Sequence, residues 1–347
     1  MHLVLYEWCC SGGLHSPAAA PTLDQTPAES LLTEGRLMLE ALAKASMQLQ
    51  AAAVTVLVDA NLPESAAPRL PSGCTRHAVA TAGDLTTLLA QAATATQVLV
   101  VAPETDGILG TLVSRLEQAG LADRLAGGSA SFVMAASDKQ ISCDLLAAAG
   151  VPVPAGRSLE PGASLPTGFC LPAIQKARCS AGGDGLRRIA TAADFVPPAT
   201  PSRLEAHVPG IPAGVCCLCG PTGVVPLLPL AQRFATGPAP IYGGGEPLAA
   251  ALRPRATSLA LRAITAIERA TQAPVRGWVG VDMILGDRED GRADRVLEVN
   301  PRLTTSFVGL TQGYASGLLA PLLAQAAGHP VHLGSCRDDA CQFLLSP

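Results

Sequence analysis

The most constraining feature of this 347-residue chain is a pair of short apolar segments joined by a charged loop. The first segment, Val279–Leu285, carries Asp282 in its middle, and the second, Arg295–Val299, contains Glu298. Residues 286–294 between them are charged and rich in turn formers, so the whole stretch predicts a β-hairpin. Two acids on paired strands either face solvent or serve a ligand.

The polar residues of this hairpin predict a magnesium site. Asn300 lies two residues beyond Glu298, so both side chains point to the same face, and a suitable register would bring Asp282 alongside. Two carboxylates and an amide oxygen suit Mg²⁺, or Mn²⁺, which keeps waters and substrate phosphates as further ligands. For Asp282 alone, a solvent-facing acid stays an open alternative. The joint pattern D…E-x-N-P-R favours the metal, and Arg302 could contact the same phosphate or a carboxylate.

The run GVDMIL…LEVNPRLTTS resembles the metal-binding hairpin of the ATP-grasp superfamily. Its members join a carboxylate to an amine or similar nucleophile through an acyl phosphate. The resemblance implies an α/β protein with an N-terminal Rossmann-like pre-ATP-grasp domain, at residues 1–125, followed by a two-lobed ATP-grasp fold at residues 126–333. The small lobe is expected near residues 150–207, and residues 334–347 are expected to form a C-terminal tail.

The first third of the chain alternates predicted strands and helices, which implies a parallel sheet with helices on both faces. Helices are also expected at Ala249–Ala270 and Tyr314–Ala327. The predicted N-terminal strands are His2–Trp8, Val54–Val58, His77–Val79 and Gln97–Val101, and the predicted helices are Pro27–Gln50, Leu85–Ala93 and Gly107–Ala119.

Ligands of such sheets bind at the carboxyl ends of the strands. Glu7 would then be a partner for the ammonium group of an amine or amino acid, and Pro103–Asp106 would be a second substrate segment. The alternative is an acid that caps nearby backbone N–H groups beside a plain tight turn. The predicted substrate contacts after the first strand are Glu7, Ser11, Gly12 and Gly13.

Two lysines are candidate phosphate ligands. Lys139 follows Asp138 at the start of a predicted helix, and Lys176 ends a predicted strand before a glycine-rich turn. Such a turn lets backbone N–H groups close over phosphates. Each lysine alone is more often a solvated surface group, but their order before the hairpin resembles the ATP-grasp pattern. The superfamily usually has proline where Ala177 stands, and the loop is expected to keep its role. The resemblance assigns Ser180, Gly182, Gly183 and Gly185 to the nucleotide.

The segment that starts at Glu205 resembles the hinge of the superfamily, in which backbone groups pair with adenine. Here these groups would belong to Ala206, His207 and Val208, and His207 is expected only to flank the base. Glu205 could accept a hydrogen bond from the adenine amino group or position Lys176.

Between the hinge and the hairpin lies a run of three glycines closed by an acid, residues 243–246. This run suits a loop that folds over substrate, and a flexible connector is the alternative. The predicted substrate contacts of this part of the chain are Tyr242, Gly244 and, after the hairpin, Thr304.

The composition narrows the possible partners. Hydrophobic residues make up 48% and charged residues 15%, with a net charge of −4, so no basic field for nucleic acid is expected. No apolar run reaches the length needed to cross a bilayer, and the N-terminus does not read as a signal peptide, so a cytoplasmic location is expected. The eleven cysteines are interpreted as small buried residues. The sequence leaves the oligomeric state open, and a homodimer is possible.

The resemblance implies a reaction between small molecules in which Lys176 and Arg302 take catalytic roles. The runs Y-E-W-C-C-S-G-G and N-P-R-L-T-T-S-F-V-G-L are similar to a subgroup that includes the tyramine–glutamate ligase of methanofuran biosynthesis. This similarity implies glutamate and tyramine as substrates. Another amino-acid or glutamate ligase, a carboxylase-like member, and a non-catalytic nucleotide-binding regulator remain alternatives.

Overall fold

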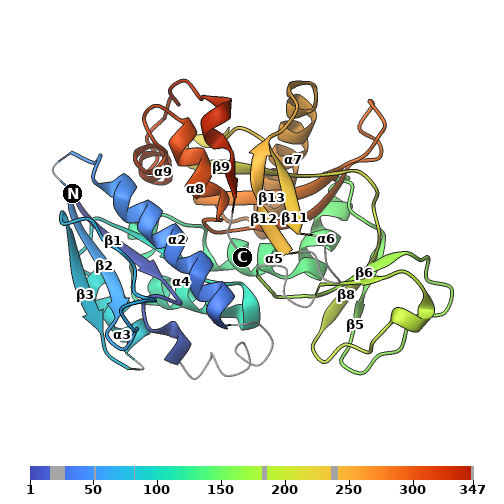
Figure 1. Ribbon diagram of the computed structural model, residues 1–347, viewed down its shortest axis with the longest axis horizontal. Coiled ribbons are helices and arrows are strands. Elements are labelled where there is room, and N and C mark those ends of the chain that lie inside the picture. Colours follow the sequence, from blue (N-terminus) through green and yellow to red (C-terminus); the bar gives the residue numbers. More distant parts are fainter. Residues whose placement is uncertain (16–27, 51, 82, 182–185, 236–240, 345–347) are drawn as a thin grey trace.

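The computed structural model describes residues 1–15, 28–50, 52–81, 83–181, 186–235 and 241–344. Its strands form three sheets (Figure 1), one in the N-terminal part, one in a small lobe and one large sheet. The two antiparallel sheets of the second part follow the parallel sheet of the first, which confirms the predicted α/β class with two unlike halves.

The N-terminal sheet has the order β3-β2-β1-β4, and each pairing in it is parallel. Most of its strand residues are apolar and buried, which is what crossover helices on a parallel sheet require. The alternation read from the sequence is therefore confirmed. The elements are β1 (His2–Glu7), β2 (Ala53–Asp59), β3 (Cys74–Val79), β4 (Gln97–Val101), α2 (Ala28–Ser46), α3 (Asp84–Ala92) and α4 (Ile108–Gln118).

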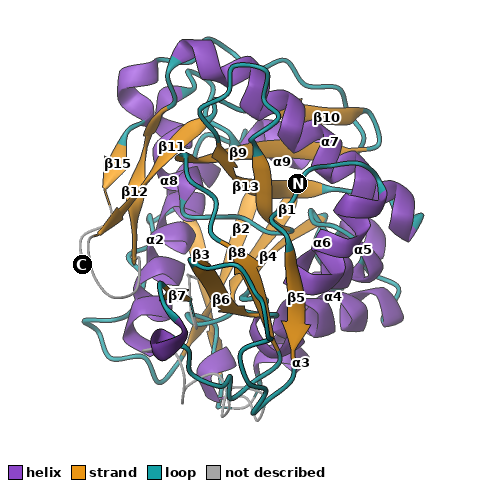
Figure 2. Cartoon of the chain, turned by 90° about the vertical axis from the view of Figure 1, so that its right-hand side faces the viewer, coloured by secondary structure: helices purple, strands orange, loops and turns teal. Residues whose placement is uncertain are grey.

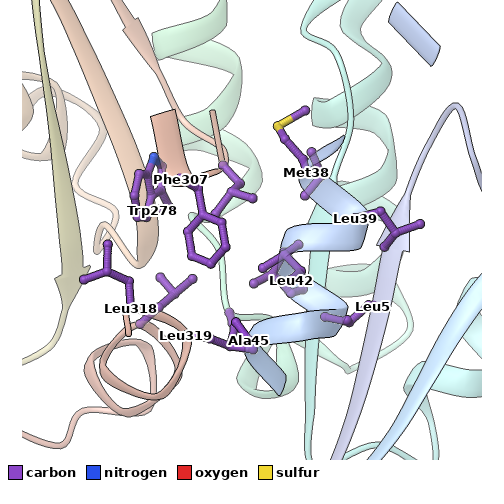
Figure 3. Close-up of a cluster of buried hydrophobic side chains, with 14 of the residues drawn as sticks. Leu5, Met38, Leu39, Leu42, Ala45, Trp278, Phe307, Leu318 and Leu319 are labelled. Atoms are coloured by element: carbon purple, nitrogen blue, oxygen red, sulfur yellow. The ribbon is translucent and has the colours of Figure 1, made fainter. Parts of the chain in front are cut away.

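Helix α2 packs between the N-terminal sheet and the C-terminal part of the chain. Its Leu39 and Leu42 are fully buried in a core cluster that also contains Trp278 and Phe307. Figure 3 shows Leu42 of α2 facing Phe307, while Leu39 points towards the strand that carries Leu5. One apolar cluster therefore joins the two parts, and α2 is held on both sides.

The small lobe is an antiparallel sheet of order β5-β8-β6-β7. Its own core is small and consists of Leu159, Ala173, Ile189 and Leu204 with partly buried neighbours. In Figure 1 this lobe lies at the lower right, away from the N-terminal sheet. Its strands are β5 (Gly156–Leu159), β6 (Ala173–Ala177), β7 (Arg187–Ile189) and β8 (Ser202–Ala206).

The large sheet has the order β14-β13-β9-β11-β12-β15, with β10 paired to β9. One apolar cluster of this sheet includes residues of α7, and the cluster shared with α2 includes residues of α8 and α9. In Figure 2 the strands occupy the middle of the molecule, and α4, α5 and α6 lie along the right side. The strands are β9 (Ile211–Gly220), β10 (Gly223–Pro226), β11 (Leu230–Ala235), β12 (Ile241–Pro247), β13 (Gly277–Leu285), β14 (Arg295–Asn300) and β15 (Phe343–Leu344); the helices are α5 (Ala130–Ser137), α6 (Lys139–Ala148), α7 (Arg253–Thr271), α8 (Ser306–Gly313) and α9 (Leu319–Ala326).

Three expectations about elements are corrected by the structure. The three glycines at 243–245 are not a loop but part of β12, which pairs with β11 on one side and β15 on the other. The helix expected from Tyr314 begins only at Leu319, because Tyr314 ends α8 in an extended conformation and Gly317 has a φ of +63°. Residues after 333 were expected to be a tail, yet Phe343 is buried and extends the large sheet.

The helices of the described ranges include none that is both long and apolar enough to span a membrane.

Candidate active site

A cavity of about 330 Å³ is lined by residues of the small lobe and of the large sheet. Strand β6 and the hinge after β8 contribute one wall, and β9, β13 and β14 contribute another. Helices α2 and α6 each add one side chain to it, Glu34 and Lys139. The cavity thus gathers residues that are far apart in the sequence.

The hairpin pairs its two acids directly. Asp282 of β13 lies opposite Glu298 of β14, and the register shifts immediately after this pair. The Asp282 carboxylate accepts hydrogen bonds from Gln232 Nε2 at 2.7 Å and from Asn300 Nδ2 at 2.9 Å. The predicted hairpin and its register are confirmed, and all three predicted metal ligands line one cavity.

The pKa values of this pair are shifted in opposite directions. Burial, followed by the repulsion from Glu298, raises the pKa of Asp282 well above its usual range. Burial also works against the charge of Glu298, but Lys139 and Lys176 outweigh it and lower its pKa. A divalent cation between the two carboxylates would relieve the repulsion, and this donor set suits Mg²⁺. Within the described residues no group of three or more His, Cys, Asp or Glu side chains converges on a possible metal position, so a cation here would rest on two carboxylates and the amide of Asn300.

The chain has only three lysines, and two of them line this cavity. Lys139 Nζ lies 3.2 Å from Glu298 Oε2 and donates to the backbone carbonyl of Ser180 at 2.8 Å. Lys176 Nζ lies 2.7 Å from Glu205 Oε1 and donates to the carbonyl of Leu297 at 3.1 Å. Both lysine side chains are buried. Positive charge buried in a cavity suits a ligand that carries phosphates.

Local structure explains how each lysine reaches the cavity. Asp138 caps α6 by accepting from the N–H groups of the first turn, and it also binds Arg178 at 2.6 Å. The backbone N–H of Lys139 donates to the carbonyl of Arg178, directly after β6, at 2.9 Å. Lys139 is therefore fixed at the start of α6 and beside the end of β6. Burial opposes the charge of Lys176, but Glu205 and Glu298 more than compensate and raise its pKa.

The hinge residues line the cavity from Glu205 to Val208. Of the two roles considered for Glu205, the structure places it on Lys176, with its other oxygen 3.1 Å from Arg203 Nε. The backbone N–H of Ala206 donates to Ala155 and that of His207 donates to Pro172. Among these described hinge residues, the N–H of Val208 is thus the donor left for a purine edge.

The predicted phosphate loop is described only in part. Ser180 lines the cavity, and its carbonyl and hydroxyl accept from Lys139. The predictions for Gly182, Gly183 and Gly185 lie outside the described residues.

The four predicted contacts of the N-terminal loop do not line the cavity. Glu7 accepts a hydrogen bond at 2.8 Å from a backbone N–H of its own loop, and Ser11 donates to a β2 carbonyl at 2.7 Å. Gly12 lies against Val79, and Gly13 lies under the ring of Trp8. The structure gives this loop a packing role, which was the alternative considered for the sequence.

The remaining predicted substrate residues are divided. Tyr242, Arg302 and Thr304 line the cavity, and Arg302 Nε is held at 2.8 Å by Glu104, which follows β4. Gly244 does not line it; a side chain there would collide with the backbone of β15.

Of the predicted segment Pro103–Asp106, Glu104 supports the cavity from behind by holding Arg302. Sequence reasoning missed three residues that line the cavity: Glu34, Gln232 and Phe234. Nothing in the spacing of these residues marks them. Only the packing of α2 and the pairing of β11 with β12 bring Glu34, Gln232 and Phe234 to the site.

Comparisons with known proteins agree with this architecture. Residues 52–131 match the family model described as pre ATP-grasp 3 domain, and residues 136–306 match the ATP-grasp domain. A search of curated proteins found no match.

Solved structures share the fold. A protein from Archaeoglobus fulgidus, described as a member of the ATP-grasp superfamily, is 22% identical with a TM-score of 0.66, covering 95% of this chain and 90% of its own. N5-carboxyaminoimidazole ribonucleotide synthetase from Thermus thermophilus is 21% identical with a TM-score of 0.65, covering 97% and 81%. L-amino acid ligase from Bacillus licheniformis is 14% identical with a TM-score of 0.61, covering 93% and 73%. The chain belongs to the ATP-grasp superfamily, with a pre-ATP-grasp domain followed by an ATP-grasp domain.

Proposed function

We propose that the protein is an ATP-dependent ligase that forms an amide bond between a carboxylate and an amine. The observation that carries this proposal is the convergence of Lys139, Lys176, Asp282 and Glu298 on one cavity. A degenerate protein that only bound a nucleotide would not need to keep the full set of metal ligands beside both lysines. The ligase and synthetase names of two similar structures point to the same class.

In this proposal the nucleotide spans the cavity. Adenine lies at the hinge beside Val208, and the phosphates lie between Lys139 and Lys176. Asp282, Glu298 and Asn300 would hold Mg²⁺ or Mn²⁺, which neutralises charge on the phosphoryl group that is transferred. Asn300 now donates to Asp282, so its amide would turn to offer an oxygen to the metal.

The chemistry follows from this placement. A substrate carboxylate attacks the γ-phosphate of ATP, and ADP leaves with the electron pair of the broken P–O bond. The acyl phosphate so formed is attacked by a neutral amine, which forms the amide and releases phosphate. Arg302 lies two residues beyond Asn300, where its guanidinium can bind the reacting carboxylate or the phosphoryl oxygens.

For the substrates themselves we propose glutamate and tyramine. Their support is the similarity of the N-terminal run and of the segment after the hairpin to the tyramine–glutamate subgroup. The N-terminal run packs away from the cavity, so the segment Asn300–Ser306 bears most of this argument.

The test is ADP release from Mg-ATP with pairs of carboxylates and amines. We expect ADP only when both partners are present, because closure over both substrates keeps water from the acyl phosphate. ADP with glutamate and many unrelated amines alike would reject tyramine and keep the ligase. ADP with bicarbonate as the sole carboxylate would favour a carboxylase, and ATP binding without turnover in any pair would favour a regulator.

A further inference from the structure

Glu34 is a charged group of the cavity with no partner among the described residues. It projects from α2 into the cavity lining and is half-buried. Within the described ranges Glu34 makes no hydrogen bond or ion pair, although every other acid of the lining has one: Glu205 and Glu298 bind lysines, and Asp282 binds Gln232. A desolvated carboxylate without a partner is costly unless a ligand supplies the opposite charge.

The neighbouring cation is already used. Arg302 is the positive group whose charge lowers the pKa of Glu34. Its Nε, however, is paired with Glu104 at 2.8 Å. The Arg302 guanidinium is thus bonded to Glu104 and acts on Glu34 only from beyond ion-pair distance. Burial raises the pKa of Glu34, and Arg302 offsets this only in part. With Glu34 and Glu104 around Arg302, these three groups carry one negative charge in excess.

An aromatic wall lies beside this charge. The rings of Tyr242 and Phe234 are 5.9 Å apart in an edge-to-face arrangement, and both line the cavity. Phe343 of β15 supports Tyr242 from behind at 6.3 Å. Burial raises the pKa of the Tyr242 phenol, and the charge of Glu34 adds to the rise, which places the two groups within electrostatic reach.

Helix packing fixes where Glu34 points. Leu39 and Leu42 bury α2 against both halves of the molecule. At Gly35, next to Glu34, a side chain would come within 2.5 Å of the buried Glu7 carboxylate, so the first part of the helix sits directly on the end of β1. The Glu34 carboxylate is thus presented by a rigid element, as a binding group should be.

We propose that Glu34 binds the ammonium group of the amine substrate, and that Tyr242 and Phe234 pack against the apolar body of the same molecule. This inference rests on the proposed ligase and, independently of the subgroup similarity, gives its second substrate as a primary amine with an aromatic or other apolar body. Glu34 recognises the cation, and the aromatic faces add a further attraction for it. The Glu34 carboxylate takes up the ammonium proton before the step of amide formation, so that the neutral amine attacks the acyl phosphate. A hydrogen bond to a charged group of this kind is expected to change affinity about 10- to 150-fold.

The experiment compares two probes of nearly equal shape, 2-phenylethylamine and the uncharged 2-phenylethanol, by calorimetry on the full chain with Mg-ADP present. We expect wild type to bind the amine at least about 10-fold more tightly than the alcohol. Glu34→Gln should lose this preference and keep its affinity for the alcohol. Glu40→Gln is the matched control on the same helix, since Glu40 accepts from the backbone of Arg69 and does not line the cavity.

A preference for the amine that survives in Glu34→Gln would overturn the inference, and so would wild type that binds both probes equally or neither. If Glu34→Gln failed to fold, wild type that bound the amine no more tightly than the alcohol would still overturn the inference.

The two proposals can fail separately. ADP formation that needs an amine, with an unchanged amine KM in Glu34→Gln, keeps the ligase and rejects Glu34. Loss of amine binding in Glu34→Gln, with no ADP from any substrate pair, keeps Glu34 and rejects the ligase.

Discussion

At the scale of single residues, the cavity is a set of buried charges that hold one another in place. Lys139 is paired with Glu298, and Lys176 is paired with Glu205. Ion pairs as buried as these gain little net stability, and each becomes costly when one partner is removed. In our proposal this arrangement serves a charged ligand rather than the fold.

Replacement of Lys176 by methionine, which keeps the apolar stem, should weaken ATP binding about 10- to 150-fold, since a charged phosphate contact of about 1.5–3 kcal/mol is lost. Lys44→Met is the control, because Lys44 is exposed on α2. Calorimetry with Mg-ATP gives both affinities. Equal affinities in the two variants would return Lys176 to a purely structural role with Glu205.

Glu7 gives a prediction about pH. Burial raises its pKa from 4.5 to about 7, although backbone N–H groups of the loop work against this shift. Between these values the folded state keeps a proton that the unfolded chain has lost, so the stabilising contribution is full below pH 4.5 and is lost as pH rises through 7. Glu7→Gln should remove this dependence, on the order of 2–3 kcal/mol. Urea unfolding at pH 5 and pH 8 measures it, and an equal change in stability for variant and wild type would contradict it.

At the scale of elements, prediction from sequence succeeded where the pattern is local. The pattern D-x₁₅-E-x-N lies on β13 and β14, which follow one another in the sequence, so the register between these two strands could be anticipated. Strand β12 was missed because three successive glycines are poor strand formers. It forms because β11 and β15 pair with both its edges, and β15 lies about a hundred residues further along the chain.

A matched pair of glycine variants tests the close approach of β15 to β12. Gly244 and Gly223 have almost the same φ, +123° and +121°, but a Cβ would lie 2.2 Å from the carbonyl oxygen of Phe343 at the first and meet nothing within 4 Å at the second. Alanine at either site should cost about 1–3 kcal/mol of backbone strain. Gly244→Ala should in addition displace β15 and make the C-terminus sensitive to proteases. Equal melting temperatures and equal proteolysis in both variants would show that β15 does not depend on this close approach.

At the scale of the whole molecule, helix α2 links the pre-ATP-grasp sheet to the ATP-grasp core and carries Glu34 to the cavity. The order of strands and helices in the first third of the chain could be predicted because it depends on local periodicity. The position of Glu34 and Phe234 at one cavity could not, because these residues are about two hundred positions apart and only tertiary packing brings them together.

Leu42→Ala should therefore destabilise both parts together. Leu42 is fully buried in the shared cluster, so its loss should cost about 2–5 kcal/mol in a single urea transition. Leu344→Ala is the control, since Leu344 is 66% exposed. Two separate transitions, of which only one moves, would mean that α2 does not couple the parts.

The central claim is that the hairpin carboxylates and the two lysines form a site for ATP-dependent ligation. ATP turnover by Glu298→Gln, with glutamate and tyramine at saturating Mg²⁺, tests it most directly. Because the change removes one charge from the predicted metal ligands, ADP formation should fall at least about 100-fold at a temperature at which circular dichroism shows the variant to be folded. Turnover close to that of wild type would contradict the claim.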